Sequence, residues 1–125
     1  MAAIHQRHPH LTFDCTTKVE HILRHPDVLP ELADAGCVFI VSAFESTNDT
    51  ILEYLDKGHS VAEASRAVVL LRAHGIEVRP SWLPFTPWTT LDDLIDLIDF
   101  VVAHDLVVNV DPVQYTCLLY TSRCV

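Results

Sequence analysis

Short apolar runs alternate along this chain with longer segments of helical periodicity, and this alternation restricts the fold more than any other feature. The runs are β-branched or aromatic and have the length of strands: LTFDC (11–15), CVFIVSAF (37–44), IEVRPSWL (76–83) and VDPVQYT (110–116). Strands that are continuously apolar and separated by helices are typical of a parallel sheet covered by helices. The sequence therefore predicts an α/β fold with about four parallel strands and outer helices.

The segments between the runs carry the start and stop signals of helices. Ser60 with Glu63, and Thr90 with Asp93, have the spacing of capping boxes. All three glycines fall where a helix should stop, so none remains for a GxGxxG or GxxxxGK[ST] phosphate loop. Helices are expected within 26–36, 47–58, 60–75 and 89–105. The helix within 60–75 has an apolar face made of Val61, Ala64, Ala67, Val68 and Leu71. The helix within 89–105 has an apolar face made of Leu91, Leu94, Ile95, Ile98 and Val102.

Two architectures fit this alternation, an open doubly wound sheet and part of a (βα) barrel of the TIM type. A complete barrel needs about 250 residues, and four strand–helix units occupy about half of one. The start, MAAIHQRHPH (1–10), reads like the last turns of a helix. We therefore expect a partial barrel, a fragment of a longer chain.

Composition excludes several classes of function. The net charge of −9 argues against nucleic-acid binding, which depends on Lys and Arg that neutralise phosphates. No apolar run approaches the length of a membrane span, and the N-terminus has no apolar segment of a secretory signal. A cytoplasmic protein with no nucleic-acid or membrane partner is expected.

The last nine residues, CLLYTSRCV (117–125), differ in character from the rest. One back-translation of them matches the end of a transposase sequencing adaptor joined to its own inverse, and the next codon of that inverse is a stop. We therefore interpret 117–125 as a sequencing artefact and 1–116 as the natural barrel domain. Cys15 and Cys37 are then the natural cysteines, with no disulfide expected.

Polar residues at the carboxyl ends of the strands are the candidate site residues, because ligands bind there in both architectures. Strand alternation places Val41, Ala43 and Glu45 on one face, with the carboxylate at its rim. Alternatively, Glu45 merely favours the start of the next helix. Lys57 either complements the end of that helix or faces a ligand carboxylate. The other candidates at these strand ends are Thr17, Lys18, Ser46, Ser81 and Gln114.

Eight histidines raise the alternative of a non-catalytic metal-binding module. His5, His8 and His10 cluster, and His21 stands four residues before His25, a spacing that can bind zinc on a helix. The sequence has no HExxH motif and offers the helical pair no evident third ligand, so solvated histidines explain the pattern better and no metal ligand is assigned.

Three segments resemble a known family: LTFDCTTKVEHILRH (11–25), ESTNDTILEYLDKGHSVAEASRAVVLLRAHGIEV (45–78) and FTPWTTLDDLIDLIDFV (85–101). Together they are similar to radical S-adenosylmethionine enzymes of the methylthiotransferase and B12-associated type, over about residues 4–116. The resemblance implies a partial (βα) barrel, with the present strands as its third to sixth. It also implies a [4Fe-4S] cluster that reduces S-adenosylmethionine to a 5′-deoxyadenosyl radical.

The resemblance also implies roles for individual residues. Glu45 falls where relatives contact the amino-acid or ribose part of S-adenosylmethionine, and Lys57 matches a basic residue that pairs with its carboxylate. Ser81 occupies a ribose-facing position. The possible further substrate or cofactor contacts are Thr17, Lys18, Ser46 and Gln114. No catalytic residue is assigned, and the substrate stays open.

The chain departs from this family in one respect that matters. The CxxxCxxC motif that ligates the cluster is absent, since Cys15 and Cys37 are far apart and lie in separate strands. The chain alone is therefore expected to be inactive. The alternative enzyme is another barrel of the aldolase or isomerase type, with Glu45 as base and Lys57 as Schiff-base lysine.

Overall fold

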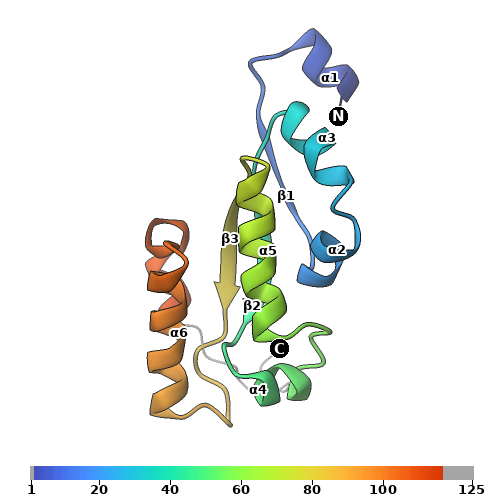
Figure 1. The fold of residues 1–125 in the computed structure, drawn as a ribbon. Coiled ribbons are helices and arrows are strands. Elements are labelled where there is room, and N and C mark those ends of the chain that lie inside the picture. Colours follow the sequence, from blue (N-terminus) through green and yellow to red (C-terminus); the bar gives the residue numbers. More distant parts are fainter. Residues whose placement is uncertain (1, 117–125) are drawn as a thin grey trace, which may run out of the picture.

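The computed structural model describes residues 2–116, which form an α/β fold with a parallel sheet (Figure 1). The sheet has the order β1-β2-β3, and both pairs of neighbouring strands are parallel. The elements are α1 (Ala2–Arg7), β1 (Phe13–Thr16), α2 (Val19–Arg24), α3 (Val28–Asp34), β2 (Cys37–Glu45), α4 (Asp49–Tyr54), α5 (Val61–Ala73), β3 (Glu77–Trp82), α6 (Leu91–Ala103) and the 3₁₀ turns η1 (Val107–Asn109) and η2 (Pro112–Thr116). The predicted α/β class is confirmed.

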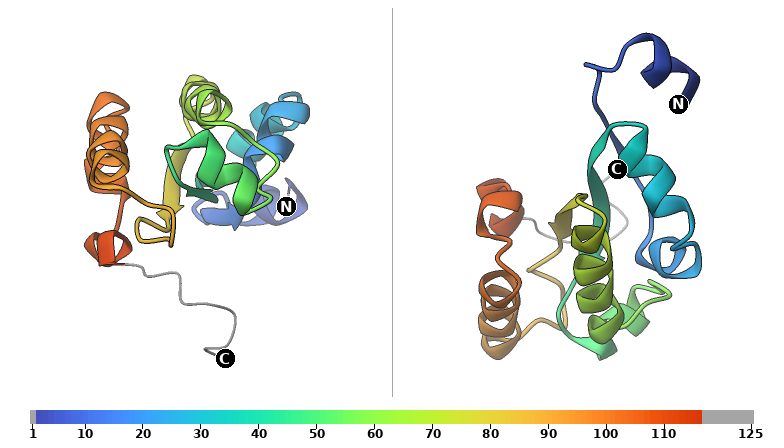
Figure 2. Two further views of the ribbon diagram at one scale, coloured as in Figure 1. Left: turned by 90° about the horizontal axis from the view of Figure 1, so that it is seen from below. Right: turned by 45° about the horizontal axis from the view of Figure 1, so that its top comes forward.

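Helices cover only one face of the sheet (Figure 2). Alternate residues of β2 and β3, such as Phe44 and Trp82, are buried on the face that packs against α2 and α5. The opposite face, which we call the open face, carries Val41, Ala43 and Glu45, as the alternation predicted. A parallel sheet with helices on one side only is consistent with a partial βα fold.

The predicted fourth strand, VDPVQYT (110–116), was wrong: the segment forms η2, and the described residues contain three strands. Pro112 has no N–H for a sheet ladder, and Asp111 turns the chain instead. The Asp111 Oδ1 atom accepts a hydrogen bond from Val113 N at 3.0 Å, and its carbonyl accepts one from Gln114 N at 2.8 Å. A four-stranded half barrel is therefore not formed by residues 2–116.

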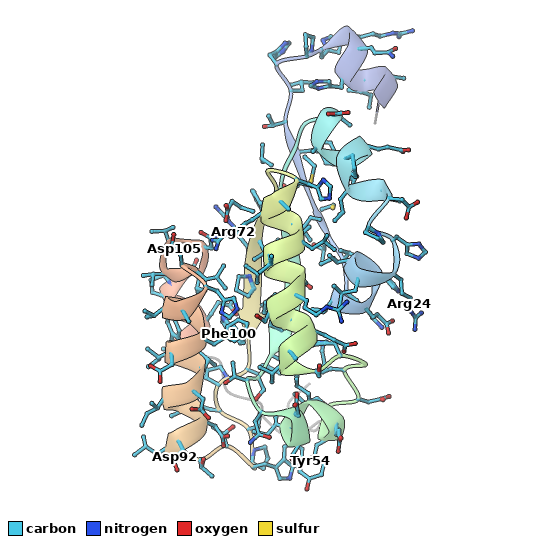
Figure 3. All side chains as sticks on the ribbon, in the orientation of Figure 1. Arg24, Tyr54, Arg72, Asp92, Phe100 and Asp105 are labelled. Atoms are coloured by element: carbon cyan, nitrogen blue, oxygen red, sulfur yellow. The ribbon has the colours of Figure 1, made fainter. Side chains whose placement is uncertain are left out.

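The predicted apolar face of α6 was also wrong. The buried residues are Leu97, Phe100 and Val101, and Phe100 extends from α6 towards the core (Figure 3). Four residues of the expected face are exposed instead, namely Leu91, Ile95, Ile98 and Val102. Because α6 is apolar on two sides, periodicity could not select the buried one; packing of Phe100 against Phe44 and Trp82, at ring centroid distances of 6.2 and 5.8 Å, selects it.

Local helix signals were read correctly. Both predicted capping boxes are present: the Ser60 and Thr90 side chains accept hydrogen bonds from the backbone of Glu63 and Asp93, whose carboxylates accept from the capping residues in return. Gly75 follows α5 with φ of +72°, a left-handed conformation that suits glycine. The face predicted for 60–75 is buried at Ala64, Ala67, Val68 and Leu71 and half-buried at Val61.

The structure tests neither the prediction for the last nine residues nor the predicted cellular location. Residues 117–125, interpreted as adaptor sequence, lie outside them. Between residues 2 and 116, none of the helices has the length and apolarity to cross a membrane. The cytoplasmic location stays a prediction.

Candidate functional site

The central strand β2 ends in a distorted conformation at Glu45. Glu45 has φ of +67°, in the left-handed region that a residue with a Cβ atom rarely adopts. The pairing of β2 with β3 is irregular between Ala43 and Glu45, and the Glu45 carbonyl accepts a hydrogen bond from Leu83 N at 2.9 Å. This conformation costs roughly 1–2 kcal/mol, and such strained residues concentrate at functional sites.

The Glu45 carboxylate forms an ion pair with Lys57. The Lys57 Nζ atom donates a hydrogen bond to Glu45 Oε1 at 3.0 Å, and the two side chains are only 25% and 14% exposed, respectively. Lys57 is held in the turn between α4 and α5, where Gly58 has φ of +70°. A Cβ atom on Gly58 would lie 3.1 Å from Glu20 Oε2, so this position favours glycine on two grounds.

The cap of α4 is made by another residue than Glu45. The side chain that caps α4 is Asn48, whose Oδ1 atom accepts hydrogen bonds from Thr50 N at 2.9 Å and Ile51 N at 3.3 Å. The Glu45 carboxylate instead contacts Lys57. The carboxyl end of the central strand therefore presents an acid and a base side by side, an arrangement that can bind a ligand carrying both charges.

Ser46 and Asn48 shape the loop that follows Glu45. The Ser46 hydroxyl is buried and accepts a hydrogen bond from Asn48 N at 3.1 Å, so it serves the turn. Asn48 was missed in the sequence, although an asparagine just before Asp-Thr-Ile is an N-cap signal. Its Nδ2 atom also donates to Asp93 Oδ1 at 2.7 Å, which joins the starts of α4 and α6 and, with the Thr90 contacts, lowers the pKa of Asp93.

Replacing Asn48 should test this link. Asn48→Ala removes the cap of α4 and the contact with Asp93, and we expect a loss of about 1–2 kcal/mol in the free energy of unfolding at pH 7 and at pH 4. Asn48→Asp keeps the cap acceptor but opposes a second carboxylate to Asp93, which raises their folded-state pKa values. The Asn48→Asp variant should therefore lose stability at pH 7. This loss in the free energy of unfolding should shrink as the pH falls and the two carboxylates take up a proton. Urea unfolding at both pH values measures this; an Ala variant as stable as the wild type would contradict it.

Thr17 and Lys18 lie elsewhere. Thr17 lines a cavity of about 270 Å³ that is also lined by Ile22 of α2 and Leu29 of α3, on the helix side of the sheet. Lys18 is the exposed residue before α2. Neither Glu45 nor Lys57 lines that cavity, so the structure does not bring these two candidates to the ion pair. Their proposed contacts stay predictions.

Ser81 and Gln114 meet at a second cavity, of about 400 Å³, on the open face beside β3. Ser81 belongs to the open face, whereas its neighbour Trp82 is buried against the helices. Gln114 reaches the edge of β3, where its Oε1 atom accepts a hydrogen bond from Trp82 N at 3.2 Å. Arg79 lines the same cavity and was missed in the sequence, because the open side of this strand becomes known only once the helices are placed.

The histidines and cysteines form no donor cluster in the described part of the chain. Among residues 2–116, no group of three or more His, Cys, Asp or Glu side chains could hold a metal ion. Cys15 and Cys37 are free thiols in neighbouring strands. Burial, together with the Cys15 thiol, raises the pKa of the Cys37 thiol to about 11, which disfavours the thiolate that binds metals.

Two known enzymes are similar to this chain in sequence. No protein-family model matches the chain. Bacteriochlorophyllide d C-8(2)-methyltransferase of Chlorobaculum tepidum is 30% identical over 83 residues, which are 65% of this chain and 18% of that protein. Anaerobic magnesium-protoporphyrin IX monomethyl ester cyclase of Synechocystis sp. is 28% identical over 113 residues, 90% of this chain and 21% of that protein.

A solved structure has the same fold. The cobalamin-dependent S-adenosylmethionine radical enzyme OxsB, with aqua-cobalamin and S-adenosylmethionine bound, matches with a TM-score of 0.65 and 22% identity, over 73% of this chain and 14% of that one. The homologues of the chain are thus radical S-adenosylmethionine enzymes, as the resemblance in the sequence predicted. The chain spans about a fifth of the length of the two curated relatives, at 18% and 21%.

The residues described here do not fit a [4Fe-4S] cluster. The described range contains two cysteines, Cys15 and Cys37, where the resemblance implies three ligands in one CxxxCxxC motif. Cys37 is also the first residue of β2, at the opposite end of that strand from Glu45. No chemical step is therefore assigned to a cluster in this part of the enzyme.

Proposed function

We propose that this chain is part of the core of a radical S-adenosylmethionine enzyme and that Glu45 and Lys57 bind the amino-acid end of the cofactor. The observation that carries the proposal is the 3.0 Å contact between the two side chains at the carboxyl end of the central strand. S-adenosylmethionine ends in an ammonium group and a carboxylate on one carbon. The Glu45 carboxylate complements the first group, and the Lys57 ammonium complements the second.

The ion pair makes this exchange of partners electrostatically balanced. Both side chains are largely shielded from water, so removing one partner would leave an uncompensated charge. A zwitterion replaces one ion pair by two and leaves neither charge unpaired. A ligand with only one charge would release one side chain without a partner, so the pair favours a zwitterion over a simple cation or anion.

The cofactor chemistry is separate from what these residues do. When bound and reduced, S-adenosylmethionine supplies a 5′-deoxyadenosyl radical that takes hydrogen from a substrate. Glu45 and Lys57 hold and orient the cofactor, and we propose that Ser81, on the same open face, contacts its ribose hydroxyls. The substrate and the complete reaction belong to the longer enzyme, since the chain covers only 18% and 21% of its curated relatives.

The aldolase or isomerase alternative agrees less well with the ion pair. A Schiff base forms from a neutral lysine amine. The Lys57 Nζ atom is instead engaged in an ion pair with Glu45 Oε1 at 3.0 Å. Borohydride reduction in the presence of a carbonyl substrate should therefore trap no adduct on Lys57, and a trapped adduct would favour the alternative.

Binding of two ligands to one variant tests the role of Lys57. We expect Lys57→Met to weaken S-adenosylmethionine binding by about tenfold or more, since a hydrogen bond between charged groups is lost. Decarboxylated S-adenosylmethionine lacks the group that Lys57 would contact, so its affinity should not fall in the variant. Titration calorimetry on the 125-residue chain gives both affinities. Arg66→Gln, on an exposed part of α5, is the matched control.

Two outcomes would contradict the proposal. The first is that Lys57→Met weakens both ligands equally, which would mean that Lys57 does not recognise the carboxylate of the cofactor. The second is that S-adenosylmethionine binds with unchanged affinity, which would leave the ion pair without a role in cofactor binding.

A further inference from the structure

We propose that Arg79, Ser81 and Gln114 form a binding site for an oxyanion of the substrate, a carboxylate or phosphate group, on the open face of the sheet. This inference deepens the proposed function and rests on it, because it names the chemistry of the molecule that shares the barrel interior with the cofactor. All three side chains line the same cavity of about 400 Å³, which has Val41 as an apolar wall. None of the roles derived for Glu45 and Lys57 involves Arg79 or Gln114.

Arg79 and Ser81 stand two residues apart in β3, so their side chains leave the strand on the same side. The Arg79 Cζ atom lies 4.3 Å from the centroid of the Phe39 ring. A guanidinium that stacks on an aromatic ring in this way keeps its N–H donors available at its edge, where they match the geometry of a carboxylate or phosphate. Phe39 thus orients a positive charge within the open face.

The charge of Arg79 has no partner among the described residues, since none of their carboxylates lies within 4.0 Å of its guanidinium. Arg72 offers the contrast within the same chain. Its guanidinium bonds the Glu77 carboxylate and the carbonyls of His104 and Asp105, so its donors are used in holding the end of α6. Arg79 is exposed on the open face, so its guanidinium donors stay available to an anionic ligand.

Gln114 adds a second donor. The backbone N–H of Trp82 can only donate, so the oxygen of the Gln114 amide must be the atom that faces it, at 3.2 Å. This contact fixes the orientation of the amide and leaves the two N–H donors of Nε2 for the cavity. The Ser81 hydroxyl lines the same cavity and can donate a hydrogen bond to an oxyanion while it accepts one from a ribose hydroxyl. One charged and two neutral donors around one space are a typical oxyanion site.

The nearby acids have other partners. Asp111 lines the cavity, and its Oδ1 atom accepts a hydrogen bond from Val113 N in the turn before η2. Glu77, two residues before Arg79, binds Arg72 and Asn109, and these contacts lower its pKa. The charge of Glu77 is thus balanced by Arg72, which leaves that of Arg79 for a ligand.

Nuclear magnetic resonance on the ¹⁵N-labelled 125-residue chain tests the site. We expect saturable shifts of the Arg79 Nε–H and Gln114 Nε2 signals on titration with succinate or inorganic phosphate, and none with neutral succinamide. Arg79→Gln should weaken this binding by about tenfold or more, whereas Arg66→Gln should leave it unchanged. The ratio of the two affinities tells a carboxylate site from a phosphate site.

The proposal is overturned if neither anion produces saturable shifts at these signals, if succinamide acts like succinate, or if Arg79→Gln binds as tightly as the wild type. The Trp82 amide signal reports whether the variant keeps the native sheet. If it does not, Arg79→Lys keeps the charge but loses the planar fork, and unchanged affinity there would count against the site. Shifts of the Glu45 and Lys57 amides on addition of S-adenosylmethionine test the proposed function separately, so the two failures are distinguishable.

Discussion

Replacing Phe100 by alanine should lower the free energy of unfolding by about 3–5 kcal/mol, whereas Ile98→Ala should change it by no more than about 0.5 kcal/mol. Phe100 packs against the Phe44 and Trp82 rings and stacks on His104, with ring centroids 4.1 Å apart. Ile98 stands two residues away in the same helix and is 54% exposed. Both substitutions introduce alanine, the best helix former, so differences in helix propensity cannot account for a large gap.

Urea unfolding of the 125-residue chain and its two variants measures this difference. If the free energy of unfolding depends on urea concentration with the same slope in all three proteins, the midpoints of unfolding give the two changes in stability. Equal losses at both positions would mean that both sides of α6 are packed in solution, and a larger loss at Ile98 would restore the face expected from the sequence. The pair thus tests the packing of α6 rather than the mere presence of a helix.

Local signals allowed much of this fold to be predicted. The Ser60 and Thr90 capping boxes depend on residues three positions apart, and the end of α5 depends on one glycine, Gly75. Such features are determined by a few neighbouring side chains, so the sequence is sufficient for them. Three of the four predicted strands are present for the same reason, as short runs of β-branched and aromatic residues.

The wrong predictions concern segments whose structure depends on contacts with distant parts of the chain. VDPVQYT (110–116) has the composition of a strand, yet Asp111 and Pro112 make a turn. The segment contacts β3 through the side-chain amide of Gln114 instead of a backbone ladder. In α6 two apolar sides compete, and only the positions of Phe44 and Trp82 decide between them. Pattern alone could not contain that information.

Some residues of the candidate site could likewise be predicted from the sequence, and others only from the fold. Glu45 and Lys57 were selected because they follow strand and helix ends, and the fold brings them within 3.0 Å of each other. Arg79 was not predicted, because the face of the sheet on which a charged residue of a strand lies is unknown until the helices are placed. The contact between Asn48 and Asp93 joins residues 45 positions apart and likewise needs the fold.

Replacing Glu45 by glycine and by alanine should give variants that differ in stability but are equally weak in cofactor binding. We expect Glu45→Gly to be more stable than Glu45→Ala by about 1 kcal/mol, because alanine keeps the cost of the left-handed conformation at φ of +67° and glycine does not. Both variants lack the carboxylate, so both should bind S-adenosylmethionine about tenfold or more weakly than the wild type. Urea unfolding and titration calorimetry give the two quantities.

Ala43→Gly is the matched control, because Ala43 lies two residues earlier on the same face without a positive φ. There glycine should cost roughly 0.5–1 kcal/mol relative to alanine, the opposite sign to position 45. Equal stability of Gly and Ala at position 45 would mean that no strain is present in solution, and full affinity in Glu45→Ala would remove Glu45 from the cofactor site. If both expectations hold, the chain retains a strained glutamate at the end of its central strand because the carboxylate there binds a ligand.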